Sequence, residues 1–362
     1  MRVLITVPSL AQEFGGPVGK AFALAEALRT RGHAVRVVGA GEAEQPGVIA
    51  LGRLGAFHGT PIPRAFAPLV RAVRGADIVH LLGLRDPVGT LAAFEARRRA
   101  IPYVLEPVGM LEPRVRSFAL KRGFDSTIGS RVIGGSAALI VTSSVERDDL
   151  ARAGIDPSRV RVRPNGVSFE GLWPLPARGP LRERLGIPAD VLLVVTLARL
   201  AAIKGFPTLV RAIAATPSFH LLIAGPDEGD GTLASIRRAA DAAGVNERVH
   251  IEPRGLWRAD RAAALSEADL FCLVSDFESF GSAAAEAAGV GVPVVLTERC
   301  GVKDVLPHAK VVPPGDAAVL ASAVLDAAGD RSRAASLSAG IRRRLSWTTL
   351  AEDQESIYEG AV

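Results

Sequence analysis

Short, mainly apolar runs alternate with longer amphipathic stretches along the chain. Val3–Val7 and Ala34–Val38 are two such runs, and in Pro17–Arg31 between them apolar residues recur at helical spacing. A short run with little polar alternation is typical of a strand buried on both faces of a parallel sheet. Helical stretches between successive runs favour βαβ units and an open sheet with helices on both faces.

This alternation occurs twice. The further predicted strands are Asp77–His80, Tyr103–Glu106, Ala138–Thr142, Val191–Leu197, His220–Ala224, Val249–Ile251, Leu270–Val274 and Pro293–Leu296. Between the two series, Trp173–Pro180 is too rich in proline for a regular element. We therefore predict two doubly wound α/β domains, at 1–168 and 185–345, with a linker at 169–184 and a separate amphipathic helix within 346–362. Two domains agree with the length of 362 residues.

The composition is that of a folded chain, with 48% hydrophobic and 22% charged residues. The only cysteines are Cys272 and Cys300. The first residues lack the long apolar region of a secretory signal, and no uninterrupted apolar stretch reaches the ~18 residues of a spanning helix. These features predict a reducing, cytoplasmic environment.

The net charge of +5 is unevenly distributed. Residues 1–175 hold 23 Lys and Arg against 15 Asp and Glu, and the remainder hold 20 against 23. A basic front half suggests an anionic partner, such as a phosphorylated substrate or an acidic membrane surface. A general compositional preference for arginine is the alternative explanation.

A glycine pair, Gly15–Gly16, follows the first predicted strand and opens the first predicted helix. Such a pair lets backbone N–H groups approach an anion at a helix N-terminus, although a plain strand–helix turn looks the same. The segment around Lys20 is not a P-loop, because Phe14 replaces the first glycine and Ala21 the Ser or Thr.

A nicotinamide dinucleotide fingerprint is also incomplete. Gly39 and Gly41 follow the second strand rather than the first, and Glu44 stands where the third glycine belongs. This argues against a nicotinamide-dependent oxidoreductase.

The strongest chemical signal is Asp276–Gly289. Glu278 lies in a loop after a predicted strand, Gly281 begins an Ala-rich helix, and Glu286 lies about a turn and a half into it. The free N–H groups of such a helix start bind phosphate, and the two carboxylates accept hydrogen bonds from sugar hydroxyls. A capping carboxylate and an exposed helical Glu are the structural alternative.

Two cations follow the first predicted strand of the second series. Arg199 lies just beyond Leu197, and Lys204 precedes Gly205 at a predicted helix start. A guanidinium fork and an ammonium suit a diphosphate, although a solvated loop pair is the simpler interpretation of these residues alone.

In combination these motifs resemble glycosyltransferase family 4 (group 1), of the GT-B fold. The segments that carry the resemblance are Gly15–Gly16, Gly109–Pro113, Pro164–Val167, Arg199–Gly205, Ala224–Pro226 and Glu278–Glu286. They extend over nearly the whole chain and are most specific in its second half. The resemblance implies two Rossmann-like domains facing across a cleft, with the C-terminal helix packing on the first.

The resemblance further implies retaining sugar transfer from a UDP- or GDP-sugar, without a metal or other cofactor. Arg199 and Lys204 would hold the diphosphate and stabilise the leaving group, and Glu278 would bind the donor sugar. The remaining implied donor-binding residues are Gly15, Gly16, Arg254, Leu256, Phe280, Gly281, Ser282 and Glu286, of which Glu286 would bind the ribose.

One residue departs from the family pattern. Many relatives carry a histidine before the glycine of the Gly109 segment, where this chain has Val108. Valine neither donates a hydrogen bond nor moves a proton, so Glu106 or His80 is considered as a replacement. In a retaining front-face mechanism the leaving phosphate itself acts as the base.

The expected acceptor is a glycan, a lipid-linked or a small-molecule hydroxyl. A predicted helix with Arg114, Arg116, Lys121 and Arg122 suggests a phosphorylated acceptor or peripheral contact with the inner face of a membrane, with a solvated helix face as the alternative. No nucleic-acid-binding pattern and no metal-ligand spacing are present. A non-catalytic nucleotide-sugar-binding protein is the alternative function.

Overall fold

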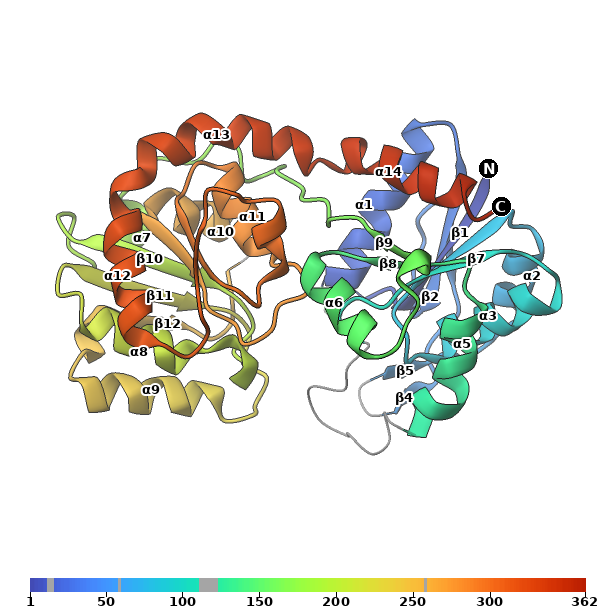
Figure 1. Cartoon of the computed structure of the whole chain (residues 1–362), viewed down its shortest axis with the longest axis horizontal. Coiled ribbons are helices and arrows are strands. Elements are labelled where there is room, and N and C mark those ends of the chain that lie inside the picture. The colour runs from blue at the N-terminus through green and yellow to red at the C-terminus, as the bar shows by residue number, and fades with distance from the viewer. Residues whose placement is uncertain (12–15, 58–59, 111–122, 257–258) are drawn as a thin grey trace. The chain divides into compact units, whose positions relative to one another are not determined.

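The computed structural model describes residues 1–11, 16–57, 60–110, 123–256 and 259–362. These residues divide into two compact units, and the chain passes between them twice. Unit 1 comprises Met1–Gly166 and Trp347–Val362, and unit 2 comprises Val167–Ser346. In each unit, helices lie on both faces of a parallel sheet, as the alternation of apolar runs predicts (Figure 1).

The sheet of unit 1 has seven strands in the order β3-β2-β1-β6-β7-β8-β9, all of them parallel. They are β1 Arg2–Ser9, β2 Ala34–Ala40, β3 Val48–Ala50, β6 Ile78–Leu82, β7 Tyr103–Glu106, β8 Ala138–Val141 and β9 Val160–Val162. A separate antiparallel hairpin is formed by β4 Gly55–Phe57 and β5 Thr60–Ile62.

The helices of unit 1 include one from the far end of the chain. They are α1 Gly16–Thr30, α2 Ala67–Arg74, α3 Pro87–Arg98, η2 Asp125–Gly129, α5 Ser130–Gly135, α6 Ser144–Arg152, η3 Pro157–Arg159 and α14 Trp347–Glu359. Helix α14 packs against α1, and Arg31 pairs with Glu352 and Glu355 across this contact. The predicted tail helix therefore belongs to the first domain.

The sheet of unit 2 has six parallel strands in the order β12-β11-β10-β13-β14-β15. They are β10 Leu192–Leu197, β11 Phe219–Ala224, β12 Val249–Glu252, β13 Leu270–Leu273, β14 Val294–Thr297 and β15 Lys310–Val312. Counted within the unit, the order is 3-2-1-4-5-6, that of a Rossmann-type doubly wound sheet.

The helices of unit 2 begin inside the segment predicted as a linker. They are α7 Pro180–Leu185, η4 Ala202–Lys204, α8 Phe206–Ala214, α9 Thr232–Ala243, η5 Asn246–Arg248, α10 Ala259–Glu267, α11 Ser282–Gly289, η6 Gly301–Asp304, α12 Ala317–Ala327, η7 Ala328–Asp330 and α13 Arg331–Arg344.

Both faces of each central strand are buried. In β10, Leu193 and Val195 belong to one hydrophobic cluster and Val194 to the cluster on the opposite face. In β1, Ile5 and Leu4 divide in the same way. Burial on both faces explains why these strands are continuous apolar runs in the sequence.

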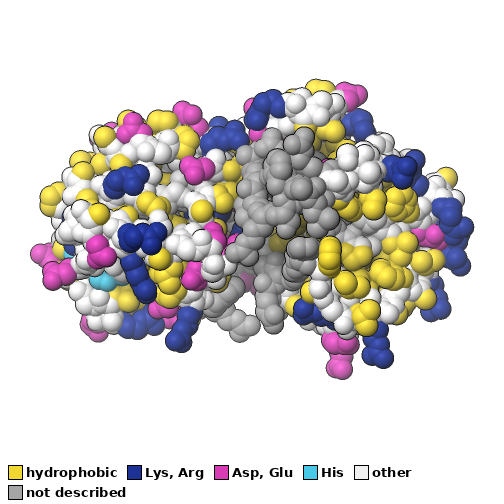
Figure 2. All heavy atoms as spheres, turned by 90° about the horizontal axis from the view of Figure 1, so that it is seen from below, with side chains coloured by type: hydrophobic (Ala, Val, Ile, Leu, Met, Phe, Trp, Pro, Cys, Tyr) yellow, Lys and Arg dark blue, Asp and Glu magenta, His cyan; other side chains and the backbone are white. Residues whose placement is uncertain are grey.

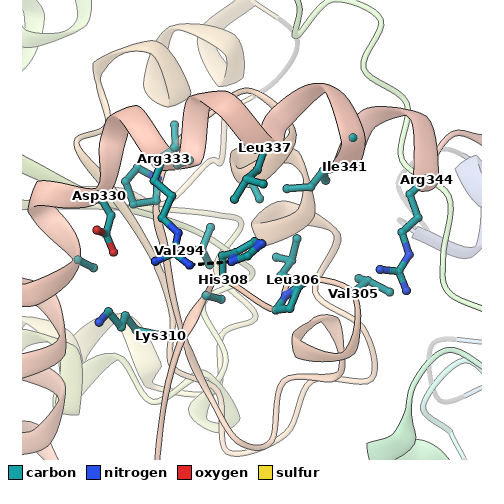
Figure 3. A pocket seen from close by; sticks show the side chains of 18 residues that line it. Val294, Val305, Leu306, His308, Lys310, Asp330, Arg333, Leu337, Ile341 and Arg344 are labelled. Atoms are coloured by element: carbon teal, nitrogen blue, oxygen red, sulfur yellow. Dashed lines mark hydrogen bonds between the residues drawn. The ribbon is translucent and has the colours of Figure 1, made fainter.

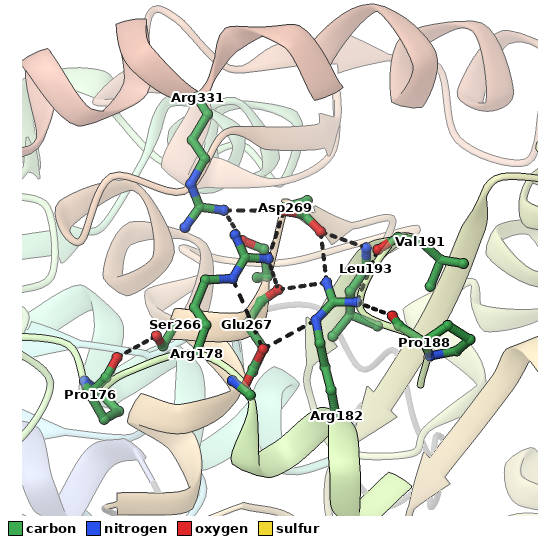
Figure 4. Close-up of polar contacts among 12 residues, drawn as sticks. Pro176, Arg178, Arg182, Pro188, Val191, Leu193, Ser266, Glu267, Asp269 and Arg331 are labelled. Atoms are coloured by element: carbon green, nitrogen blue, oxygen red, sulfur yellow. Dashed lines mark hydrogen bonds and ion pairs between the residues drawn. The ribbon is translucent and has the colours of Figure 1, made fainter. Parts of the chain in front are cut away.

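The prediction of a linker at 169–184 is wrong. Leu172 is buried in the core of unit 2, and α7 starts within this segment. Arg178 and Arg182 reach Asp269 at 2.8 and 2.9 Å, and Arg182 also reaches Glu267 at 3.1 Å (Figure 4). The prolines make the segment irregular, but these ion pairs and the buried leucine fix it to unit 2.

We expect Glu267→Gln to lower the free energy of unfolding by about 1.5–3 kcal/mol, because the buried Arg182 loses one of its two carboxylate partners and keeps only Asp269. Chemical denaturation monitored by circular dichroism measures this difference. Glu183→Gln, an exposed neighbour of Arg182 on α7, is the matched control and should unfold like the wild type. An unchanged midpoint for Glu267→Gln would show that the ion pair does not stabilise unit 2.

Candidate active site

The chemically distinctive residues of unit 2 lie at the topological switch point of its sheet. Strand β10 is paired with β11 on one side and β13 on the other, and the strand order reverses between β10 and β13. Loops that leave the carboxyl ends of two such strands run in opposite directions and open a crevice, where ligands bind in sheets of this kind. The two predicted motifs follow these two strands.

The loop after β10 carries the cations. It runs from Leu197 through Arg199 to η4, which ends at Lys204, and α8 follows at once. Gly205 between them has φ +67°, and a Cβ there would overlap the carbonyl oxygen of Val274. Glycine at this position therefore lets the Lys204 backbone lie against the end of β13.

The loop after β13 carries Glu278 and leads into α11. The backbone of Glu278 is fixed at both ends, since its N–H donates to Arg299 at 3.0 Å and its carbonyl accepts from Gly301 at 2.9 Å. Gly281 caps α11 with φ +103°. The N–H groups of Ser282 and Ala283 precede the first intrahelical bonds, which Ala284 and Ala285 donate to Gly281, and so are available to a ligand.

The side chains of Lys204 and Glu278 join the two loops. The Nζ of Lys204 lies 2.5 Å from Oε2 of Glu278, and both side chains are largely shielded from solvent, with 10% and 19% exposed. The backbones meet as well, because the N–H of Asp276 donates to the carbonyl of Ile203 at 2.9 Å. Two residues predicted independently, 74 positions apart, are thus hydrogen-bonded partners.

The other predicted cation, Arg199, is more open. Its side chain is 60% exposed and forms an ion pair with Glu228, which follows β11. The structure therefore brings Lys204 and Glu278 into contact and leaves the Arg199 side chain exposed and paired with Glu228.

Glu286 has a partner that the sequence analysis missed. The Nε of Arg261, on α10, donates to Oε2 of Glu286 at 2.5 Å, and Nη2 of the same guanidinium contacts the same oxygen. Burial raises the pKa of Glu286, and Arg261 opposes that rise. No spacing rule links residues 261 and 286, which lie on different helices, so only the fold reveals the pair.

The remaining predicted donor-binding residues of unit 2 differ in accessibility. Arg254 and Ser282 are exposed. Arg254 also pairs through its backbone with Pro226, at the end of β11. Phe280 and Leu256 are instead core residues, with 1% and 8% exposed. Both side chains pack in the hydrophobic core of unit 2, and the prediction that these two residues bind the donor stays a prediction.

In unit 1, Gly15 lies outside the described residues, whereas Gly16 is the first residue of α1 and is exposed. The segment with Val108 forms a tight turn, in which Val108 has φ +50° and the N–H of Gly109 donates to Glu146 at 2.7 Å. Glu146 also accepts from Thr142, so it holds this turn against the end of β8.

The two residues considered as replacements for the missing histidine are buried. Glu106 and His80 are both 0% exposed. Glu106 accepts from Lys20 and, at 2.8 Å, from Arg163, and His80 hydrogen-bonds Tyr358 of α14 at 2.8 Å. Neither side chain reaches solvent, and their contacts join elements of unit 1; a role for either in place of the missing histidine stays a prediction.

The ionisation of this cluster follows from its partners. Burial alone would raise the pKa of Glu106, but Lys20 and Arg163 outweigh it and hold that pKa well below its usual range. Burial lowers the pKa of Lys20 to about 8 and also lowers the pKa of His80. Asn165, from the Pro164–Val167 motif, accepts a second hydrogen bond from Lys20 and so ties this loop to α1.

The basic helix predicted around Arg114–Arg122 lies outside the described residues. Lys and Arg side chains of the described part occur on both halves of the face in Figure 2. No described helix has the length and hydropathy needed to cross a bilayer. Within the same residues, no three His, Cys, Asp or Glu side chains are grouped as a metal ion would need.

A cavity of about 200 Å³ lies elsewhere in unit 2, beneath α13. It is lined by Val294, Leu306, Leu337 and Ile341, with Arg333 and His308 in contact at its edge (Figure 3). None of the predicted site residues lines it. The cavity is therefore distinct from the switch point.

In a comparison with known proteins, both halves of the chain match glycosyltransferase families. Residues 178–344 match the family described as "Glycosyl transferases group 1", and residues 15–166 match the "Glycosyl transferase 4-like domain". A D-inositol 3-phosphate glycosyltransferase from Xylanimonas cellulosilytica is 32% identical over 307 residues, which cover 79% of this chain and 72% of that protein. One from Kineococcus radiotolerans is 31% identical over 253 residues, 64% of this chain and 56% of that protein.

Solved structures share the fold over the whole chain. Sucrose-phosphate synthase from Thermosynechococcus elongatus has a TM-score of 0.77 at 22% identity, covering 99% of this chain and 98% of that one. HepE from Anabaena, in complex with UDP, has a TM-score of 0.78 at 18% identity, covering 99% and 100%. At these identities the likeness shows the fold, which is GT-B.

We expect the buried Glu106 to make stability depend on pH. Its folded-state pKa is held below the ordinary value of 4.5, so its contribution is present above that value and is lost as the pH falls below about 5. Glu106→Gln should therefore be less stable than the wild type at pH 7, and the gap should narrow toward pH 3. Denaturant titrations across this range measure it.

The control for this series is Asp148→Asn, which removes an exposed ion pair with Arg147. It should follow the wild type at every pH, because exposed pairs contribute little. A stability gap for Glu106→Gln that stays constant with pH would contradict the assignment of an ionised, paired carboxylate.

Proposed function

The chain belongs to the group 1 glycosyltransferases of family 4, and we propose that it moves a sugar, with retention, from a UDP- or GDP-sugar to an acceptor hydroxyl. The coarse activity, glycosyl transfer, follows from the family. The donor, the acceptor class and the stereochemistry are the proposed part. The acceptor we propose is a glycan, a lipid-linked sugar or a small molecule.

The contact between Lys204 and Glu278 carries this proposal. It places a cation, a carboxylate and the N-terminus of α11 at one switch point. A diphosphate needs positive charge and N–H donors, and the sugar attached to it needs an acceptor for its hydroxyl groups. The 2.5 Å contact supports a site where both requirements meet.

The diphosphate would lie between Lys204, Arg199 and the N–H groups of Ser282 and Ala283. An ammonium has three N–H groups, so Lys204 can keep its bond to Glu278 and still donate to phosphate. Arg199 is exposed and would exchange its ion pair with Glu228 for the more highly charged ligand. Glu286 would accept hydrogen bonds from the ribose hydroxyls.

The proposed reaction breaks the bond between C1 of the sugar and the phosphate oxygen and forms the bond between C1 and the acceptor oxygen on the same face. The acceptor proton passes to the departing phosphate, so no side chain is required as the base. This route suits a chain with Val108 in the histidine position and with Glu106 and His80 buried. Lys204, Arg199 and the start of α11 would stabilise the charge that develops on the phosphate.

The names of similar proteins support this substrate class. The curated relatives are D-inositol 3-phosphate glycosyltransferases, which makes a phosphorylated polyol one candidate acceptor here. HepE binds UDP in its solved complex, which favours uridine in the donor without excluding guanosine. A calorimetric screen of nucleoside diphosphates would identify the nucleobase of the donor.

We expect Glu278→Gln to lower turnover by at least ~10²-fold, the usual cost of removing one transition-state contact, with the thermal unfolding curve unchanged. Glutamine keeps a carbonyl oxygen for Lys204, so the loops should stay joined. Release of UDP or GDP from the sugar donor measures turnover. Asp326→Asn, an exposed change on α12, is the control. Near-normal turnover of Glu278→Gln would remove Glu278 from the reaction.

Lys204→Met should weaken binding of the nucleoside diphosphate by about 10- to 100-fold, the range for one charge-assisted hydrogen bond. It should leave binding of the nucleoside alone unchanged, because the nucleoside lacks the diphosphate. Calorimetry with UDP and uridine, or GDP and guanosine, makes the comparison. Equal loss for both ligands would instead indicate a general disturbance of the loop.

A further inference from the structure

The ion pair of Arg261 and Glu286 engages only one oxygen of the carboxylate. Both Nε and Nη2 of Arg261 contact Oε2. Among the described residues, no hydrogen bond is made to Oε1 of Glu286. Two N–H groups on one oxygen hold that oxygen in place and leave the second oxygen for another donor.

The pair sits in a sheltered but accessible place. The side chains of Arg261 and Glu286 are 26% and 16% exposed. Glu286 lies on an Ala-rich helix whose residues Ala284, Ala285 and Ala287 are buried. In such apolar surroundings a carboxylate is costly to keep ionised, and burial does raise the pKa of Glu286. Arg261 is the charged partner that offsets this cost.

The helix that carries Arg261 comes soon after the segment that follows β12. The N–H of Gly225 donates to Glu252 and that of Asp227 to Pro253, both at 3.1 Å, so this segment is fixed to the loop after β11. Residues 254–256, where the resemblance places the nucleobase, are followed by α10, which carries Arg261 in its first turn. Arg261 therefore follows the proposed base segment along the chain, and its guanidinium contacts Glu286, the residue proposed to bind the ribose.

We propose that Arg261 is a positioning residue that orients Glu286 toward the ribose diol and so makes binding depend on the 2′- and 3′-hydroxyls of the nucleotide. The inference rests on the proposed function, since it assumes a ribonucleoside diphosphate at this site. Arg261 lies on α10 and acts through Glu286, without touching the ligand itself. It would determine the preference for ribose over a sugar that lacks the diol.

The test compares one nucleoside diphosphate with its 2′,3′-dideoxy analogue. UDP and dideoxy-UDP are titrated by calorimetry into the wild type and Arg261→Gln, or the guanosine pair if the wild type prefers GDP. We expect Arg261→Gln to weaken binding of the ribonucleotide by roughly ten-fold, as for a lost charge-assisted hydrogen bond, and binding of the dideoxy analogue by less than about two-fold. Ribose discrimination should then disappear.

A purely structural ion pair gives a different result. If Arg261 only holds α10 against α11, Arg261→Gln weakens both ligands equally or neither, and either outcome overturns the inference. If the wild type binds the ribonucleotide no better than the dideoxy analogue, the ribose role of Glu286 fails, and the inference with it. If neither diphosphate binds the wild type, the proposed function itself fails.

Two further variants guard against a folding defect. Arg261→Lys keeps the charge but cannot place two N–H groups on Oε2, so we expect discrimination between the wild-type and Arg261→Gln values. If both Arg261→Lys and Arg261→Gln prefer the ribonucleotide over the dideoxy analogue as strongly as the wild type does, the inference is overturned. The matched control is Arg184→Gln, which removes the exposed pair with Asp260, the residue next to Arg261 on α10. It should bind both ligands as the wild type does.

Discussion

The function proposed for unit 2 depends on the hydrogen bond between Lys204 and Glu278. It joins the loops that leave β10 and β13, the two strands between which the strand order reverses. Parallel strands have their carboxyl ends at one edge of the sheet, so whatever follows them meets there. Gly205 allows the first loop to approach and Gly281 turns the second into α11, so that a cation, a carboxylate and a helix N-terminus converge.

Unit 1 uses its buried charges differently. Glu106, Lys20 and Arg163 form a closed ionic group, and His80 extends it to Tyr358 on the C-terminal helix. Removing one member of such a group is costly, because the others remain charged in a medium that solvates them poorly. The group thus joins β7, α1, the Asn165 loop and α14 into one body. In the proposed reaction, the donor phosphate and residues of unit 2 carry out the transfer.

Most strands of the two sheets could be predicted from the sequence, because strands that are buried on both faces appear as apolar runs. The strands it missed, β3, β9 and β15, have three residues each and lie at or near sheet edges, where the apolar signal is weak. The hairpin of β4 and β5 carries exposed Phe57 and lacks a core-facing pattern. The segment 169–184 was predicted to be a linker because its prolines exclude a regular helix or strand. An irregular segment can still be packed against a domain, as this one is.

The site was predictable where a motif lies next to a strand end, as for Lys204 and Glu278. It was not predictable where two helices bring distant side chains together, as for Arg261 and Glu286, or where an aromatic residue in the motif turns into the core, as Phe280 does. Side-chain direction in a loop depends on packing that no spacing rule contains. The burial of Glu106 and His80 also depends on tertiary packing and could not be predicted from the sequence.

A crystal structure of the complex with UDP or GDP tests the central claim most directly. The account predicts electron density for the two phosphates within hydrogen-bonding distance of the Lys204 ammonium and of the N–H groups at the start of α11. Phosphates found away from that switch point, for example at the arginines beside the cavity under α13, would contradict it.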